Sequence, residues 1–381
     1  MTEKIKIACV VGTRPEAIKM APLVLALKGD PAFETSLLAS GQHTDMLFQA
    51  LDHFGVEADV NLDIMKDSQT LDHITTAVLG GVGRFLDSNP QDLLLVHGDT
   101  TTTLASALAG FYRKTPVGHV EAGLRSRDLT RPFPEEANRV LTDRISTLYF
   151  APTPLSAENL WAEGVGKPRV FVTGNTVIDA LFWTLARIGE TDLLRGMPAR
   201  QPLVLMTAHR RESWGKPLEE ICAAARSILE KHPELRLLVP LHKNPAPRNT
   251  IMDALRGCAN VVFTEPLGYP EFVAVMNRSL FIMSDSGGVQ EEASALKKPV
   301  LILRELSERP EAIETGTGVL VGTDRNRIER EALRLLEDES YRRSFADADR
   351  GAPFGDGNAS ARIVNIVKNY FAEQSGRVPG S

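Results

Sequence analysis

The stretch Ile5–Lys28 reads IKIACVVGTRPEAIKMAPLVLALK and carries the pattern that decides the fold. Its first seven residues are apolar on both faces, as expected of a strand buried in a parallel sheet between layers of helices. A polar turn follows, in which Thr13 and Glu16 have the spacing of a capping box. The proline between them suits the first turn of a helix, so a strand–turn–helix unit is expected here.

The same order of apolar run and helical pattern recurs along all 381 residues. The expected strands are Ile5–Val11, Ser36–Ala39, Leu93–Val96, Val117–Val120, Leu148–Ala151, Val170–Val172, Leu203–Thr207, Leu237–Pro240, Val261–Phe263, Leu280–Met283, Val300–Leu303 and Val319–Val321. The expected helices include Pro15–Lys28, Thr101–Arg113, Glu135–Ile145, Pro217–Lys231, Gly288–Leu296 and Ala359–Phe371. This alternation is typical of the doubly wound α/β class.

Twelve strands are too many for one small domain, and the pattern restarts at Leu203–Thr207. The preceding stretch Gly189–Gln201 contains glycine, proline and charged residues, which is typical of a surface connection. We therefore expect two Rossmann-like domains facing each other. The domain to which the last helix, Ala359–Phe371, belongs does not follow from the pattern alone.

Composition excludes several classes of protein. Apolar residues make up 43% of the chain and charged residues 24%, which fits globular domains and excludes a disordered or collagen-like chain. The formal net charge of −6 argues against a nucleic-acid binder. The three cysteines have long spacings and predict neither a disulfide framework nor a zinc site. The first apolar run is too short for a signal peptide or a membrane span, so a cytoplasmic protein is expected.

The turn after the first strand is a candidate phosphate site. A helix N-terminus presents free N–H groups, and Arg14 lies beside them. An ordinary helix start with a surface arginine explains the same residues equally well. No GxGxxG follows the strand and no GxxxxGK[ST] occurs in the chain. These absences argue against NAD-dependent enzymes and P-loop NTPases.

Three carboxylates are candidates for acid–base chemistry. Asp99 and Glu121 directly follow two neighbouring apolar runs, and Glu135 stands at an expected helix start. Carboxylates that share a site can take separate acid and base roles. Each also has a structural explanation, since Asp99 could cap a helix and Glu135 could pair with Arg139 at i,i+4. Glu121 has no evident cap or ion-pair role.

The second half supplies candidates for binding an anion. His209 follows a strand and precedes two arginines, and His242 ends another strand. The segment Ser286–Gly288 follows an apolar run and opens a helix, so the backbone can approach a phosphate. Glu292, one turn later, can accept hydrogen bonds from ribose hydroxyls, although a glutamate on a solvent face is the alternative. Arg309 is a further phosphate candidate.

Together these residues indicate a nucleotide diphosphate held by the second domain and carboxylates supplied by the first. That combination suggests an enzyme acting on a nucleotide sugar. It does not choose between glycosyl transfer, hydrolysis and isomerisation.

Eight motifs in order make a resemblance visible. They are GTRPEAIKMAP (12–22), VHGDTTTT (96–103), GHVEAGLR (118–125), PEEANR (134–139), TGNTVIDAL (173–181), TAHRRE (207–212), DSGGVQEEA (285–293) and ERPEA (308–312). The chain resembles the bacterial non-hydrolysing UDP-N-acetylglucosamine 2-epimerases from about residue 5 to residue 371. The resemblance implies a GT-B-like fold of two Rossmann-like domains with an interdomain cleft. The implied domains are 1–175 with 358–374, and 176–357, followed by a tail of 375–381.

The resemblance also implies a reaction. UDP-GlcNAc and UDP-ManNAc are interconverted by expelling UDP to give 2-acetamidoglucal, followed by its re-addition after C2 is protonated on the other face. No metal and no redox cofactor is required, and a homodimer is expected. Matched positions imply catalytic roles for Asp99, Glu121, Glu135 and His209. They imply substrate binding by Arg14, Lys19, Arg139, Phe272, Ser286, Gly287, Gly288, Glu292 and Arg309.

Many family members carry a second UDP-GlcNAc pocket that activates the enzyme. Gln42, Glu135, Arg210 and His242 match its pattern, but Asp45 replaces a glutamine and Ser68 replaces an arginine. Each lost charged contact weakens binding of an anion by about 1–3 kcal/mol. We therefore expect substrate activation to be weak, absent or dependent on other contacts.

Three other functions are compatible with this class of fold. A hydrolysing epimerase would release ManNAc and UDP, and a glycosyltransferase would use a separate acceptor. The third is a nucleotide-sugar sensor without catalysis, which would be expected to lose Asp99, Glu121 or His209. All three of those residues are present.

Overall fold

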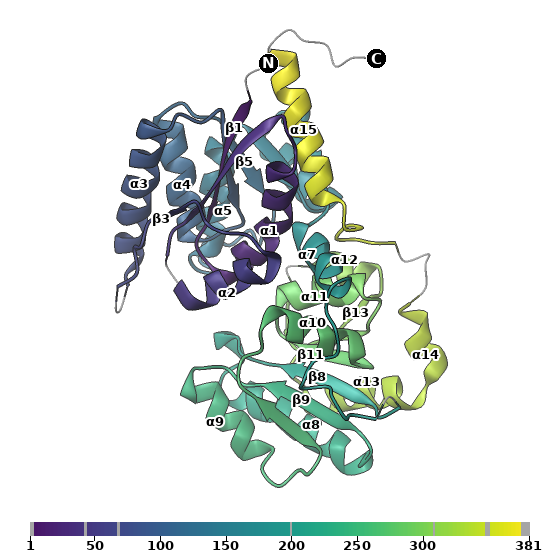
Figure 1. Cartoon of the computed structure of the whole chain (residues 1–381). Coiled ribbons are helices and arrows are strands. Elements are labelled where there is room, and N and C mark those ends of the chain that lie inside the picture. The colour runs from purple at the N-terminus through teal and green to yellow at the C-terminus, as the bar shows by residue number, and fades with distance from the viewer. Residues whose placement is uncertain are drawn as a thin grey trace. The chain divides into compact units, whose positions relative to one another are not determined.

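The computed structural model describes residues 4–41, 44–66, 69–198, 200–307, 309–346 and 351–374 (Figure 1). The chain forms two compact units. Unit 1 comprises Met1–Trp183 with Gly355–Ser381, and unit 2 comprises Thr184–Phe354. Each unit has its own parallel sheet covered by helices, so the two are described separately.

In the described part of unit 1, seven parallel strands form one sheet in the order β3-β2-β1-β4-β5-β6-β7. The strands are β1 (Ile5–Val11), β2 (Phe33–Ala39), β3 (Val60–Asn61), β4 (Leu93–His97), β5 (Val117–Val120), β6 (Leu148–Ala151) and β7 (Val170–Val172). The strand order reverses direction between β1 and β4. In open α/β sheets, ligands bind beyond the carboxyl ends of the strands at this switch point.

The helices of unit 1 follow the strands in turn. They are α1 (Arg14–Lys28), α2 (Thr44–Phe54), α3 (Leu71–Ser88), α4 (Thr101–Tyr112), α5 (Glu135–Ile145), α6 (Pro154–Ala162), α7 (Thr176–Leu185, whose last two residues fall in unit 2) and α15 (Ala359–Gln374). The last helix, α15, packs against α1, and Lys368 pairs with Asp30 at 2.5 Å. Asp179 on α7 accepts the backbone N–H groups of Ala359 and Ser360, which fixes the start of α15.

Unit 2 repeats the architecture. Over its described residues, six parallel strands follow the order β10-β9-β8-β11-β12-β13. They are β8 (Leu203–Thr207), β9 (Arg236–Pro240), β10 (Val261–Thr264), β11 (Phe281–Ser284), β12 (Val300–Ile302) and β13 (Gly318–Leu320). The helices are α8 (Lys216–Lys231), α9 (Pro245–Ala254), α10 (Tyr269–Arg278), α11 (Gly287–Ala295), α12 (Pro310–Glu314), α13 (Arg325–Glu337) and α14 (Glu339–Ser344). The switch point lies between β8 and β11.

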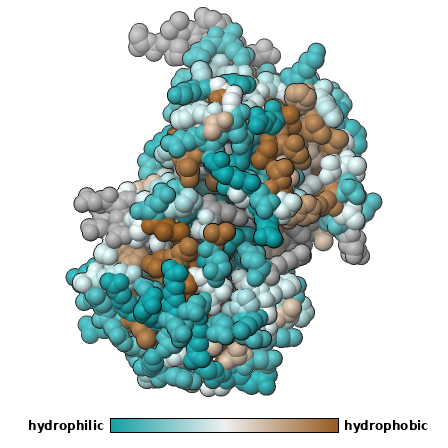
Figure 2. Space-filling model, turned by 180° about the vertical axis from the view of Figure 1, so that it is seen from behind, coloured by the Kyte–Doolittle hydropathy of each residue, from teal (hydrophilic) through white to brown (hydrophobic). Residues whose placement is uncertain are grey.

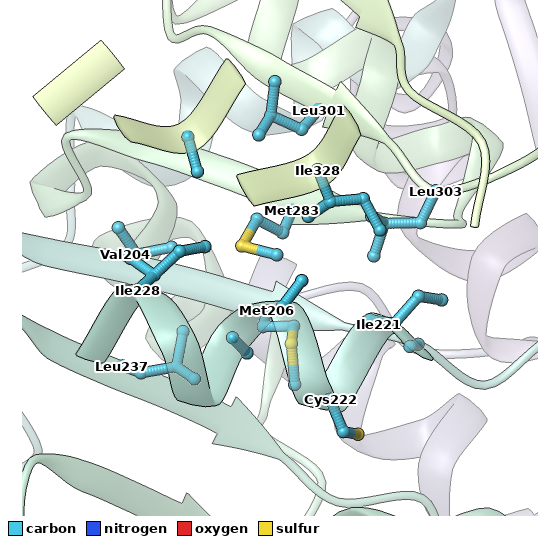
Figure 3. Close-up of a cluster of buried hydrophobic side chains, with 14 of the residues drawn as sticks. Val204, Met206, Ile221, Cys222, Ile228, Leu237, Met283, Leu301, Leu303 and Ile328 are labelled. Carbon is cyan, nitrogen blue, oxygen red and sulfur yellow. The ribbon is translucent and has the colours of Figure 1, made fainter. Parts of the chain in front are cut away.

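The core of unit 2 shows why its strands are apolar on both faces. Met206 and Met283, from the two central strands, belong to one buried cluster with Ile221 and Ile228 of α8 (Figure 3). Ile328 of α13 belongs to the same buried cluster. Full burial of one such side chain contributes about 1.5–3 kcal/mol. The strands are therefore held in place largely by side-chain burial.

The twelve strands expected from the sequence are all present, with bounds that differ by up to three residues, and β3 is an additional strand. β3 was not expected, because two residues are too few to show a period of two. The expected surface connection at 189–201 contains neither helix nor strand in its described residues. The three cysteines are all free thiols. No helix in the described ranges is both long enough and apolar enough to cross a membrane.

Candidate functional site

The turn between β1 and α1 is closed by a buried glutamate. Glu16 accepts the backbone N–H groups of Gly12 and Thr13 at 2.9 and 2.7 Å. Its second oxygen accepts the hydroxyls of Thr100 and Thr103, at the start of α4. The capping role expected of Glu16 is therefore present. The backbone N–H groups of Gly12 and Thr13 donate to Glu16 and are not free. For these two N–H groups, the expectation that the turn offers free donors to a phosphate is wrong.

Glu121 lies at the carboxyl end of β5 and is buried, with a backbone φ of 65°. Its Oε2 forms an ion pair with Lys19 of α1 and accepts a hydrogen bond from Asn175 at 2.8 Å. A left-handed conformation is uncommon for a glutamate, and such residues occur often at active sites. Lys19 and Asn175 both donate to this carboxylate, so they stabilise its anionic form.

His97 is the third side chain beside Glu121. It is the last residue of β4, is 3% exposed, and places Nε2 3.6 Å from Glu121 Oε2. Neither ring nitrogen has a hydrogen-bond partner among the described residues. A buried polar group without a partner is uncommon in folded proteins and is a reason to look for a ligand or a catalytic role.

Asp99 follows the neighbouring strand and is held differently. Its carboxylate pairs with Arg139 of α5 at 2.7 Å, and its backbone carbonyl accepts a hydrogen bond from Asn138. Arg139 also contacts buried Glu136 at 3.3 Å. Asp99 and Glu121 thus follow paired strands, β4 and β5, as expected, and each has a cation beside it. The cap of α4 is Thr100, so the alternative in which Asp99 caps this helix is not what the structure shows.

A fully buried pair links the turns that carry these carboxylates. His119 Nε2 lies 2.8 Å from the carbonyl oxygen of Gly98, and Nδ1 lies 2.6 Å from Asp143. Asp143 in turn accepts from the N–H of Gly123 and from Arg125. At Gly123 a Cβ would lie 2.2 Å from the carbonyl oxygen of Ser156, so only glycine fits. The pair therefore fixes both strand ends together.

Glu135 and Arg14 occupy the first positions of α5 and α1 and are partly buried. Glu135 precedes Glu136, which accepts the N–H groups of Ser126 and Arg127. Arg139 forms ion pairs with Asp99 and Glu136. Glu135 is thus on the same helix as the arginine that contacts Asp99.

In unit 2, His209 lies just beyond the carboxyl end of β8, with 40% of its side chain exposed. The backbone N–H groups of His209 and Arg210 both donate to the carboxylate of Asp285, beyond the adjacent strand β11. The ring of His242 stacks on that of His209, with centroids 5.8 Å apart. Burial lowers the pKa of His242, and the neighbouring His209 lowers it further.

The expected phosphate loop forms the start of α11. Ser286 is the N-cap residue, and the helix begins at Gly287. A Cβ at Gly288 would meet no atom within 4 Å, which leaves this turn open to a ligand. Glu292 is 5% exposed and accepts the hydroxyl of Tyr269 at 2.8 Å. The alternative that placed Glu292 on a solvent face is therefore wrong.

Two further candidates, Arg309 and Phe272, also belong to unit 2. Arg309 is buried and pairs with Glu291 of α11, so its guanidinium is positioned by the helix that carries the phosphate loop. Phe272 is a partly buried residue of α10.

The residues matched to the second, activating pocket lie partly outside the described residues. Gln42 and Ser68 lie outside the described residues, and only the backbone of Asp45 is described, within α2. Arg210 contributes its backbone N–H to Asp285, and His242 is exposed at its turn.

Sequence reasoning missed six side chains around these sites. They are His97, His119, Asp143, Asn175, Tyr269 and Asp285. His97 and Asp285 could have been found, since they stand at strand ends beside residues already chosen. The others come from positions whose contacts depend on the folded sheet.

The two units define a class of protein. Each is a parallel α/β sheet with its polar residues gathered beyond the carboxyl ends of the central strands. One unit presents carboxylates paired with cations, and the other presents a glycine-rich helix start, a histidine and an arginine. This arrangement is that of the GT-B-like nucleotide-sugar proteins.

Comparison with known proteins gives the family. The family model described as UDP-N-acetylglucosamine 2-epimerase matches residues 25–368. The chain is 48% identical to the UDP-N-acetylglucosamine 2-epimerase of Yersinia pestis, covering 96% of this chain and 99% of that one. It is 47% identical to the enzyme of the same name from Escherichia coli K12, with 96% and 98% covered. A crystal structure of UDP-GlcNAc 2-epimerase from Neisseria meningitidis bound to UDP-GlcNAc is 43% identical, with a TM-score of 0.90 and 96% and 100% covered. The chain belongs to the UDP-N-acetylglucosamine 2-epimerase family.

Proposed function

We propose that this protein interconverts UDP-GlcNAc and UDP-ManNAc by eliminating UDP and adding it back to 2-acetamidoglucal. The observation that carries the proposal is the pair of carboxylates, Asp99 and Glu121, at neighbouring strand ends with Arg139 and Lys19 beside them. Inversion at C2 requires a proton to leave one face and another to arrive at the opposite face. Two separately held carboxylates suit that requirement.

Unit 1 is proposed to carry out the proton transfers. One carboxylate takes the C2 proton as the C1–O bond to UDP breaks, and the electron pair of the C2–H bond forms the C1–C2 double bond. In the return step C2 gains a proton on the other face, and a phosphate oxygen of UDP attacks C1. We assign these transfers to Asp99, Glu121 and Glu135 as a group.

Unit 2 is proposed to hold the UDP moiety. Ser286, Gly287 and Gly288 offer the helix N-terminus to the diphosphate, whose charge the helix dipole stabilises. Arg309 adds a cation, and Glu292, held by Tyr269, accepts from the ribose hydroxyls. His209 assists departure of the diphosphate.

The remaining assignments complete the substrate site. Arg14, Lys19 and Arg139 are proposed to contact substrate from unit 1, and Phe272 to pack against the uracil. The reaction is proposed to take place in the cytoplasm and to need neither a metal nor a redox cofactor.

The test is proton NMR of the purified protein with UDP-GlcNAc in deuterated water. We expect signals of UDP-ManNAc to appear while deuterium replaces the C2 proton in both sugars. ManNAc and UDP as the main products would establish the hydrolysing reaction instead. Tight UDP-GlcNAc binding without exchange or product would leave the chain a sensor and refute the proposal.

We also propose that the protein is a homodimer. Phe111 and Tyr112 at the end of α4 and Leu141 of α5 are each more than half exposed. Figure 2 shows hydrophobic side chains gathered in several patches on the face that it displays. Exposed aromatic clusters of this kind are typical of interaction surfaces.

A further inference from the structure

Asp285 is a completely buried carboxylate with one oxygen left without a hydrogen bond. Its Oδ2 accepts the backbone N–H groups of His209 and Arg210 at 2.7 and 2.8 Å. Its Oδ1 has no hydrogen-bond partner among the described residues, and it lies 3.5 Å from Nδ1 of the His209 ring. A buried carboxylate oxygen without a donor is costly, so this geometry calls for an explanation.

The fold brings the two residues together through adjacent strands. β8 and β11 pair in parallel with Thr207 opposite Ser284, and the hydroxyls of these residues lie 2.7 Å apart. The N–H of Asp285 donates to the carbonyl of Thr207 at 3.2 Å. Asp285 and His209 are thus the first polar positions beyond two strand ends held in fixed register.

Two aromatic side chains contact His209. His242 stacks on its ring with the ring planes 3° from parallel. Trp214 donates its indole N–H to the backbone carbonyl oxygen of His209. Among the described residues, the titratable side chains that contact the ring are Asp285 and His242.

We propose that Asp285 is a positioning residue that keeps the proton of His209 on Nδ1 and so directs Nε2 toward the ligand. A carboxylate can only accept, so the ring nitrogen facing it must carry a hydrogen. Nε2 is then the atom that exchanges a proton with a phosphate oxygen. The catalytic consequence rests on the proposed function, whereas the tautomer does not.

The chemistry is balanced by a single proton. During elimination, Nε2 of the imidazolium gives its proton to a phosphate oxygen of departing UDP, and the ring stays protonated at Nδ1. During re-addition, Nε2 takes the proton back. Asp285 stabilises the charged ring without itself becoming protonated, as the buried aspartate does in a Ser-His-Asp triad.

Replacement of Asp285 by asparagine should reverse the tautomer. The amide oxygen of the variant can keep the hydrogen bonds from His209 and Arg210. The amide NH₂ then faces Nδ1, which must accept, and the ring hydrogen moves to Nε2. The backbone contacts survive, so the variant separates tautomer control from the general integrity of the loop.

The experiment is long-range proton–nitrogen NMR of histidine-labelled protein at mildly alkaline pH, with His209 assigned through H209Q. We expect the Nδ1–H form in the unmodified protein and the Nε2–H form in D285N. We expect kcat for epimerisation to fall at least about 100-fold in D285N, by analogy with the wrong-tautomer triad variant. The dissociation constant for UDP should change less than about threefold. D253N, the same change at an exposed aspartate of α9, serves as the control.

The outcomes of this experiment test the positioning role of Asp285 and the proposed function separately. An Nε2–H ring in the unmodified protein would overturn the proposal even if D285N failed to fold. An unchanged tautomer in a folded D285N would overturn it as well. An unmodified protein with the Nδ1–H ring and no epimerase activity would support the positioning role and refute the proposed function.

Discussion

The backbone of Glu121 is the most constrained part of the candidate site. Its φ is 65°, and its carboxylate contacts Lys19 of α1 and Asn175, which directly precedes α7. The carboxylate is buried and has a lysine and an amide donor beside it. A carboxylate held in this way is a candidate for the base that takes the C2 proton.

Glutamine at position 121 keeps the shape and removes the base. We expect E121Q to reduce kcat about 100- to 10,000-fold, the usual range for loss of a positioned acid or base. Exchange of the C2 proton in deuterated water should fall in parallel, and UDP affinity should stay within about threefold of the unmodified protein. E158Q, on the exposed face of α6, is the matched control. Full exchange activity in E121Q would remove Glu121 from the proton transfers.

Asp99 and Glu121 could be predicted as neighbours from the sequence, because carboxyl ends of parallel strands share one edge of a sheet. The partners of Glu121 could not. Asn175 lies 54 residues away along the chain. Lys19 lies on α1, and the local sequence does not determine which side of that helix faces Glu121. The motif DSGGVQEEA contains Asp285, so its place after a strand could be predicted. Its contact with His209 could not, because that contact depends on the register of β8 against β11.

At the scale of elements, the His119–Asp143 pair joins the turns after β4 and β5. Burial alone would raise the pKa of Asp143. The charges of His119 and Arg125, with their hydrogen bonds, lower it more, so the net pKa lies below the ordinary 3.8. A lowered folded pKa means that the ionised carboxylate stabilises the fold above the unfolded pKa. That stabilisation is lost as pH falls through the folded pKa.

Removing this charge should therefore destabilise unit 1 in a pH-dependent way. We expect D143N to lower the free energy of unfolding by about 3–5 kcal/mol at neutral pH, the cost of breaking a buried pair. The difference from the unmodified protein should shrink below about pH 4. Urea unfolding curves from acid to neutral pH measure it. A difference independent of pH would show that packing, not charge, carries the effect.

The start of α15 offers a second element-scale test. Asp179 on α7 accepts the N–H groups of Ala359 and Ser360 at 3.1 and 2.7 Å. Loss of two buried backbone hydrogen bonds at D179A should cost about 1–3 kcal/mol per unpaired group. Hydrogen exchange of residues 359–374 should then speed up before that of β1. Equal acceleration in both would mean that α15 does not open separately.

Element bounds were predictable where burial imposes a strong pattern. Val117–Val120 and Leu203–Thr207 have the expected limits because every residue in them is apolar or points into a packed layer. β3 was not predictable, since its two residues pair only at the edge of β2. The Rossmann-like sheets thus follow from local pattern, whereas their edges depend on pairing.

At the scale of the whole molecule, the exposed side chains of α4 and α5 should bear on assembly. We expect light scattering to give twice the chain mass of 41.7 kDa. F111D places a charge on the proposed interface and should shift the protein toward a monomer at micromolar concentration. L306D, at an 80% exposed leucine of unit 2, should leave the mass unchanged. A monomeric unmodified protein would refute the dimer.

The response to substrate is the other property of the whole molecule. By the family resemblance, Asp45 and Ser68 stand where a glutamine and an arginine are found in relatives with an activating pocket, so we expect an anionic effector to bind this chain less tightly. Loss of the charged contact at position 68 weakens binding of an anion by about 1–3 kcal/mol, and a carboxylate at position 45 weakens it further. We therefore expect hyperbolic UDP-ManNAc kinetics without added UDP-GlcNAc. The variant S68R with D45Q should restore activation, seen as turnover that rises when UDP-GlcNAc is added. Unmodified protein that is inert toward UDP-ManNAc until UDP-GlcNAc is present would show that other contacts form the pocket.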